Sequence, residues 1–123
     1  MLSVSLAAPD SIASGGRVTF RLLVRNTSGR AVDLYLRGRK PTLDVVVERE
    51  DGRVVWRGLE GRVIPAVLQV ESLAPGQTLE VSAVWDLQST EPPVEQGTYV
   101  VRASLLADDA AIAATPGRFT ITR

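Results

Sequence analysis

Apolar and polar residues alternate along most of this chain with a period of two. In the clearest run, Val18, Phe20, Leu22 and Val24 alternate with mostly polar neighbours. Such alternation is typical of a β-strand with one buried and one solvated face, and no segment has the helical period over a useful length. Comparable runs recur at residues 2–6, 32–36, 43–47, 54–56, 68–71, 79–85, 99–105 and 119–121.

Turn-forming residues separate these runs at short intervals. Asp51 and Gly52 stand between two β-rich runs and predict a tight hairpin, because such a turn needs a residue that accepts positive φ. Pro75 and Gly76 mark a further turn. The spacing predicts an all-β fold, an immunoglobulin-like antiparallel β-sandwich of about eight or nine strands, formed by a single domain over residues 1–123.

Three aromatic residues refine this prediction. Trp56 and Trp85 fall on the inward phases of their strands, which predicts that both belong to the core. For Trp56 the alternative is an exposed anchor for a partner, since this residue borders an irregular stretch. Tyr99 follows Gly97 at the start of a late strand, where a tyrosine corner would tie the strand to the preceding loop.

Three stretches of the chain do not alternate. Residues 10–16 predict a turn, and residues 107–116, rich in Ala and Asp, predict a hairpin loop or a short helical turn. Residues 57–67 are neither alternating nor helical and form the longest irregular stretch in the body of the chain. Loops of this kind, held by a rigid scaffold, often carry the binding residues of a protein.

The composition removes most catalytic and metal-binding chemistry. The chain has no His and no Cys, so the commonest general base, the usual nucleophilic dyads and the imidazole and thiolate metal ligands are missing. Glu48 with Glu50, and Asp108 with Asp109, predict solvated surface, because the alternating ligand spacing of a calcium loop is lacking. The sequence therefore predicts a non-enzymatic binding protein without a cofactor or a metal.

The charge balance narrows the class of partner. The 14 basic and 14 acidic residues give a formal net charge of zero, which argues against nucleic acid and anionic membranes, since both require a basic excess. No stretch approaches the roughly 20 apolar residues of a membrane span. The start of the chain lacks the basic and apolar regions of a signal sequence. We therefore expect a cytoplasmic protein, although removal of a targeting segment would leave the same start.

A series of landmarks in a fixed order carries a family resemblance. They are Asp51-Gly52 followed by Trp56, then Leu73-Ala74-Pro75-Gly76, then Trp85-Asp86, then Gly97-Thr98-Tyr99. From about residue 18 to residue 106 the chain resembles the BsuPI domain, the intracellular proteinase inhibitor family of bacilli. The resemblance implies a cytoplasmic bacterial domain of immunoglobulin-like fold that inhibits an intracellular subtilisin-type serine protease.

Residues 57–67 are the first candidate for the inhibitory contact. A protease cleft binds its ligand as an extended strand, and a rigid loop loses little entropy when it offers one. Because a subtilisin-like specificity pocket often takes a large apolar side chain, we expect Leu59 or Ile64 at the reactive bond. The alternative is that this loop only crosses between sheets and that Ile64 fills the core. The candidate contact residues are Arg57, Leu59, Arg62 and Ile64, with Arg37, Arg39 and Lys40 of a basic loop as secondary candidates.

Two other functions stay open at this point. One is a general protein–protein interaction module with this fold and no inhibitory activity, acting through a free sheet edge or through the outward Leu23, Val46 and Val84. This function predicts a contiguous apolar patch outside the core. The other is a carbohydrate-binding accessory domain, which needs exposed coplanar aromatic side chains. Two Trp, two Tyr and two Phe, most of them on inward phases, make it the weaker alternative.

Overall fold

The computed structural model describes residues 2–90, 93–108 and 112–122. These residues form several β-sheets and no α-helix, which confirms the all-β prediction. The described part has eleven strands rather than eight or nine. The strands are β1 (Leu2–Ala7), β2 (Ser11–Ala13), β3 (Arg17–Asn26), β4 (Val32–Arg37), β5 (Leu43–Arg49), β6 (Val54–Arg57), β7 (Leu68–Leu73), β8 (Thr78–Asp86), β9 (Gly97–Leu105), β10 (Ile112–Ala113) and β11 (Gly117–Thr122), and a 3-10 turn, η1 (Leu87–Ser89), follows β8.

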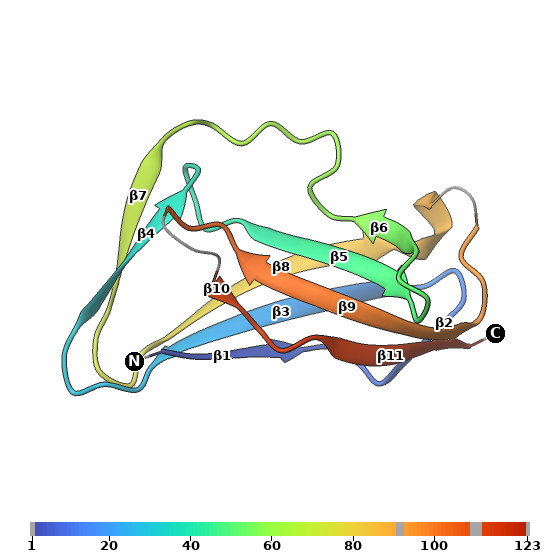
Figure 1. Ribbon diagram of the computed structural model, residues 1–123, viewed down its shortest axis with the longest axis horizontal. Helices are drawn as coiled ribbons and strands as arrows, with labels where there is room; N and C mark the ends of the chain where they lie inside the picture. The colour runs from blue at the N-terminus through green and yellow to red at the C-terminus, as the bar shows by residue number, and fades with distance from the viewer. Residues whose placement is uncertain (1, 91–92, 109–111, 123) are drawn as a thin grey trace.

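The strands are arranged in three sheets (Figure 1). The first contains β1, β3 and β8, in that order. The second has the order β2-β11-β9-β5-β6, and β10 also pairs with β9. The third consists of β4 and β7 alone. All these strand pairs are antiparallel except β2 with β11.

The main hydrophobic core lies where the first and second sheets face each other, with β3 and β8 behind β5 and β9 in Figure 1. Phe20 of β3, Trp85 of β8 and Phe119 of β11 are at most 2% exposed. The ring of Phe119 meets those of Phe20 and Trp85 edge-on, at centroid distances of 5.9 and 6.3 Å. Aromatic contacts between the sheets therefore fix their spacing, and each fully buried large side chain contributes roughly 1.5–3 kcal/mol.

The long strands bury the residues that their alternation predicts. In β3, Val18, Phe20, Leu22 and Val24 are all at most 2% exposed, and the residues between them are more accessible. β5 and β9 show the same alternation of buried and more accessible positions. The period-two pattern therefore predicts correctly which face of each of these strands is inside.

The two tryptophans differ in how deeply they are buried. Trp85 is 1% exposed, and its indole N–H donates to Thr90 Oγ1 at 2.7 Å. Trp56 is only half-buried, but its ring stacks on that of Trp85 at 5.4 Å and on that of Phe20 at 6.3 Å. Both residues thus take part in core packing, as predicted, while part of Trp56 stays accessible to solvent.

The predicted hairpin turn joins β5 to β6. Gly52 has φ of 91°, a region that favours glycine because it has no Cβ. The backbone N–H of Arg49 donates to the carbonyl of Arg53 at 2.8 Å, and that of Arg53 donates to Asp51 Oδ1 at 2.9 Å. The Asp-Gly pair therefore forms the predicted turn, because Gly52 adopts the positive φ that the turn requires.

Tyr99 forms the predicted tyrosine corner. Its side chain is 2% exposed, and its hydroxyl donates to the backbone carbonyl of Glu95 at 2.6 Å. Burial raises the pKa of the phenol, partly opposed by the nearby charge of Arg49. Arg49 itself donates to Glu95 Oε2 at 2.6 Å, and this bond raises the pKa of the guanidinium above its ordinary value. The loop before β9 is therefore tied both to the start of that strand and to the end of β5.

Two short strands lie in stretches that were predicted from the sequence to be irregular, residues 10–16 and 107–116. Residues 10–16 contain β2, whose three residues are too few for alternation to be recognised. Within residues 107–116, Ile112 and Ala113 form β10 and pair with the end of β9, so this part is neither a loop nor a helical turn. Residues 109–111, including Asp109 of the acidic pair, lie outside the described residues.

Candidate functional site

Residues 57–67 begin in a compact turn that is fixed to β5. The backbone N–H of Gly58 donates to the carbonyl of Val45 at 2.8 Å. The N–H of Arg62 then donates to the carbonyl of Leu59 at 3.0 Å, and Gly61, at φ of 74°, allows this reversal. The first part of the loop is therefore held close to the end of β6.

The other end of this loop is fixed to the turn between β4 and β5. The backbone N–H of Gly38 donates to the carbonyl of Val67 at 2.9 Å. The side-chain amide of Gln69 donates back to the carbonyl of Gly38 at 3.1 Å. The two loops that the sequence analysis singled out separately, residues 57–67 and 37–41, therefore lie side by side.

Residues 63–66 lie between these two attachments and have no regular structure (Figure 1). Among the described residues, no hydrogen bond reaches the backbone of this segment. Val63 is 91% exposed, more than any other large apolar residue in the described part of the chain. The segment thus combines fixed ends, an unpaired backbone and a projecting apolar side chain.

The four primary candidate residues lie in different environments. Arg57 is the exposed last residue of β6, where it pairs with Val46. Leu59 is half-buried in the compact turn, and Arg62 is exposed at its end. Ile64 is half-buried, but it is not among the residues that pack against the main core. Ile64 instead lies near the turn between β4 and β5, where a Cβ built on Gly38 would be 3.5 Å from Ile64 Cγ2.

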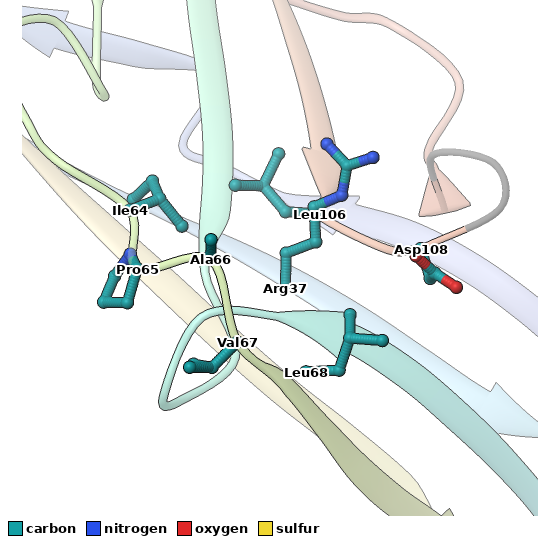
Figure 2. Close-up of a pocket in the computed structure, with 8 residues that line it drawn as sticks. All are labelled: Arg37, Ile64, Pro65, Ala66, Val67, Leu68, Leu106 and Asp108. Atoms are coloured by element: carbon teal, nitrogen blue, oxygen red, sulfur yellow. The ribbon is translucent and has the colours of Figure 1, made fainter.

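Ile64 lines a pocket of about 510 Å³ together with residues of β4, β7 and the segment after β9. Figure 2 shows Ile64 and Pro65 on one side and Asp108 on the other, with Arg37 and Leu68 between them. The lining residues are Arg37, Ile64, Pro65, Ala66, Val67, Leu68, Leu106 and Asp108. The pocket has the size of a site for a side chain or a small molecule, and its walls are mostly apolar.

The secondary candidates surround this region. Arg37, at the end of β4, is exposed and lines the pocket. Arg39 and Lys40 are exposed in the turn that follows. Lys40 also borders, with Arg62 and Trp56, a second hollow of about 250 Å³. Together with Arg57 and Arg62, the three secondary candidates bring the number of cationic side chains in or next to the two adjacent loops to five.

The sequence analysis missed an exposed apolar face next to this pocket. Tyr35, Leu68 and Val70 are 52%, 56% and 55% exposed. Tyr35 lies directly opposite Val70 in the β4–β7 register, and Arg37 lies opposite Leu68, so these side chains share one face. We call Tyr35, Leu68 and Val70 the hairpin face. It continues into the pocket through Leu68.

One signal in β7 could have revealed the hairpin face. Leu68 and Val70 occupy one phase of the strand, and Leu73, which is 2% exposed, occupies the other. Apolar residues in both phases mean that some of them must face solvent or a partner. The outward residues that were predicted instead, Leu23, Val46 and Val84, lie on two different sheets and do not form one patch.

Two kinds of feature, a metal-ligating cluster and a membrane-spanning helix, are absent from the described residues. No group of three or more His, Cys, Asp or Glu side chains among them could hold a metal ion. No helix in the described part of the chain is long and apolar enough to cross a membrane. The features that stand out are a loop whose ends are fixed and whose backbone is unpaired over residues 63–66, and an exposed apolar face beside it.

The comparison with protein families identifies the family of the chain. The sequence profile of the BsuPI family, described as intracellular proteinase inhibitor, matches residues 6–110. The chain therefore belongs to the BsuPI family of intracellular proteinase inhibitors, which confirms the resemblance seen in its landmarks. No curated protein matches the chain significantly.

Solved structures share the fold at low sequence identity. The CARDB domain of a Pyrococcus furiosus protein, in complex with di-metal ions, is 15% identical, with a TM-score of 0.54 over 99% of this chain and 93% of that one. A Listeria innocua β-glucosidase, in complex with isofagomine, is 11% identical, with a TM-score of 0.54 over 100% of this chain and 16% of that one. A Pseudomonas fluorescens alkylpurine DNA glycosylase, bound to DNA, is 11% identical, with a TM-score of 0.53 over 99% of this chain and 30% of that one. The likeness concerns the fold alone.

Proposed function

We propose that this protein inhibits a cytoplasmic subtilisin-type serine protease, and that an immunoglobulin-like sandwich presents residues 62–66 to the protease cleft. The family to which the chain belongs supports an inhibitor. The observation that carries the site is the segment 63–66, whose backbone is unpaired within the described residues while both its ends are held. The subtilisin type of the target and the cytoplasmic location follow from the family resemblance.

The proposed contact uses the backbone of the segment first. Proteases bind substrates as extended strands through main-chain hydrogen bonds, and the pockets beside the strand select side chains. The free N–H and C=O groups of this segment suit such pairing. Because the Leu59 and Val67 carbonyls already hold its ends, the segment loses little conformational freedom on binding, and that lowers the entropic cost of association.

Val63 is the side chain best placed to enter the specificity pocket of the protease. It is 91% exposed, whereas the two residues expected from the sequence, Leu59 and Ile64, are half-buried. Ile64 and Pro65 instead support the segment from the side of the 510 Å³ pocket. The reactive bond would then follow Val63, with Arg62 and Ile64 in the neighbouring subsites.

Steady-state inhibition of a purified intracellular subtilisin-type protease tests this function. The unmodified protein should slow hydrolysis of a chromogenic peptide and survive the incubation. Val63→Asp should raise the inhibition constant about tenfold or more, because an apolar pocket does not accept a carboxylate. Val54→Asp is the control, since Val54 is also exposed, at 37%, and lines a hollow with Arg49 and Glu95 to which none of residues 57–67 contributes. Rapid cleavage of the unmodified protein without inhibition, across several such proteases, would contradict the proposal.

A second function is favoured by the hairpin face. A protein interaction module without inhibitory activity would use Tyr35, Leu68 and Val70, which are all more than half exposed. Such a module would bind its partner through this face while no protease is slowed. A pull-down with the unmodified protein and with Tyr35→Thr, followed by the inhibition assay, separates the two functions.

A further inference from the structure

The segment 63–66, even together with Arg62, is too small to form a stable protease complex alone. Stable protein–protein interfaces bury about 800 Å² on each partner and involve roughly 20–30 residues a side. Five residues supply only a fraction of that area. The surface next to the segment must therefore contribute most of the contact if the proposed inhibition is to be tight.

The hairpin face adjoins the segment and has the chemistry of an interface centre. Leu68 lines the same pocket as Ile64 and Pro65, and Tyr35 and Val70 continue from it along β4 and β7. Fully buried centres of interfaces are enriched in aromatic and apolar residues and depleted of charge. Tyrosine in particular is over-represented among residues that dominate binding energy.

Cationic side chains lie on the loop side of this apolar centre, whereas Asp33 follows it on the same face of the hairpin and Asp108 lines the pocket. Residues 37–42 and 57–68 hold five basic residues against one acidic residue, Glu60, although the whole chain has a formal net charge of zero. In the described part of the chain, none of the five forms a salt bridge. The five are Arg37, Arg39, Lys40, Arg57 and Arg62. A partner surface that covers this region should therefore be acidic at its rim, because opposite charges speed encounter and fix orientation.

We propose that the hairpin face is a second docking site for the target protease, and that the basic residues around it pair with an acidic rim beside the protease cleft. This inference rests on the proposed inhibitory function. The extended segment would occupy the cleft, Tyr35 and Val70 would lie against an apolar patch outside it, and Arg37 and Arg39 would face carboxylates of the rim. The second site supplies the area that the segment lacks.

A double variant tests the apolar part of the second site. Tyr35→Thr with Val70→Thr keeps residues that favour strands but removes most of the apolar contact. It should raise the inhibition constant about tenfold or more, with thermal unfolding unchanged within a few degrees. Val54→Thr is the control, since Val54 is an exposed valine, at 37%, whose hollow includes no residue of the two loops or of the hairpin face. This control should leave the inhibition constant within about twofold.

The outcomes separate this inference from the function on which it rests. If the unmodified protein inhibits, Val63→Asp abolishes inhibition and the double variant inhibits normally, the second site is refuted and the inhibitory function stands. If the unmodified protein inhibits no protease, both are refuted. A loss in the double variant with an intact fold supports the second site.

Association kinetics test the charged part of the second site. Arg37→Glu with Arg39→Glu should slow association with the protease about tenfold at low ionic strength, with a smaller effect at about 0.5 M salt, where screening shortens the reach of charges. Arg21→Glu, at an exposed position of β3, is the control and should change the rate little. An equal effect of Arg21→Glu and of the Arg37→Glu, Arg39→Glu variant would refute an acidic rim. Faster association of the Arg37→Glu, Arg39→Glu variant would refute it too.

Discussion

The hydroxyl of Tyr99 donates a 2.6 Å hydrogen bond to the backbone carbonyl of Glu95, four residues earlier. This contact closes the loop before β9 against the strand that carries much of the core. The ring also stacks on Phe119 at 6.0 Å. One residue thus joins a local hydrogen bond to the packing of two strands.

Tyr99→Phe should lower the free energy of unfolding by about 1–2 kcal/mol, because it removes the hydrogen bond and leaves the ring packing intact. Urea unfolding, followed by tryptophan fluorescence, measures this change. Tyr35→Phe is the control, since Tyr35 is 52% exposed, and it should have almost no effect. Equal stability of Tyr99→Phe and the unmodified protein would mean that the corner contributes nothing.

Alkaline pH should weaken the fold through the same residue. Burial raises the pKa of Tyr99 above its ordinary value of 10.0. Below that value the phenol is protonated in both states, so it adds no pH dependence. Above it the unfolded chain loses the proton first, and the free energy of unfolding falls as pH rises. Unfolding midpoints at about pH 9 and pH 11 should differ less in Tyr99→Phe than in the unmodified protein.

Asn26 is the only buried polar residue in the described part of the chain, at 0% exposure. Its amide group donates to the carbonyls of Arg30 and Leu73 at 2.7 and 2.9 Å, and its Oδ1 accepts from the N–H and hydroxyl of Ser28. Asn26→Leu should therefore cost about 2–4 kcal/mol, since the buried carbonyl of Leu73 and the partly buried carbonyl of Arg30 and N–H of Ser28 lose their partner. Ser28→Ala removes only hydroxyl contacts, so equilibrium unfolding should show a smaller loss; a larger one would contradict this account of Asn26.

Two glycines offer a matched test of backbone strain. Gly52 has φ of 91° and an added Cβ would meet nothing within 4 Å, so Gly52→Ala isolates the conformational cost. We expect a loss of about 1–2 kcal/mol. Gly29 is equally open but is not at positive φ, so Gly29→Ala should be neutral or slightly stabilising. Thermal melting of both variants measures the difference, and similar shifts would show that φ does not matter here.

The fold could be predicted best from the sequence where a single residue or a short run carries a local signal. The alternation in β3 fixes which face is inside, Gly52 is needed by its turn, and Tyr99 has both a ring to bury and a hydroxyl to satisfy. Each of these signals is local. The pairing of β2 with β11 is not local, because it joins residues more than 100 positions apart, and three residues carry too little pattern to predict it.

The candidate site was harder to predict because exposure depends on tertiary contacts. Leu59, Val63 and Ile64 are similar apolar residues in one loop, yet only Val63 projects into solvent. Leu59 lies in the compact turn after β6 and Ile64 lines the adjoining pocket, and the sequence reveals neither placement. Tyr35 and Val70 were missed for the same reason, since only the β4–β7 register shows that they share a face.

The attachments of the loop also determine what a cut within it would do. If a protease cleaved after Val63, the new end on one side would stay held through Arg62 and Leu59, and the end on the other side through Val67 and Gly38. Neither fragment could diffuse away, and the nicked chain would keep its two termini close together. Under the proposed function, religation by the bound protease would then compete with release, so cleavage at this bond would not by itself end inhibition.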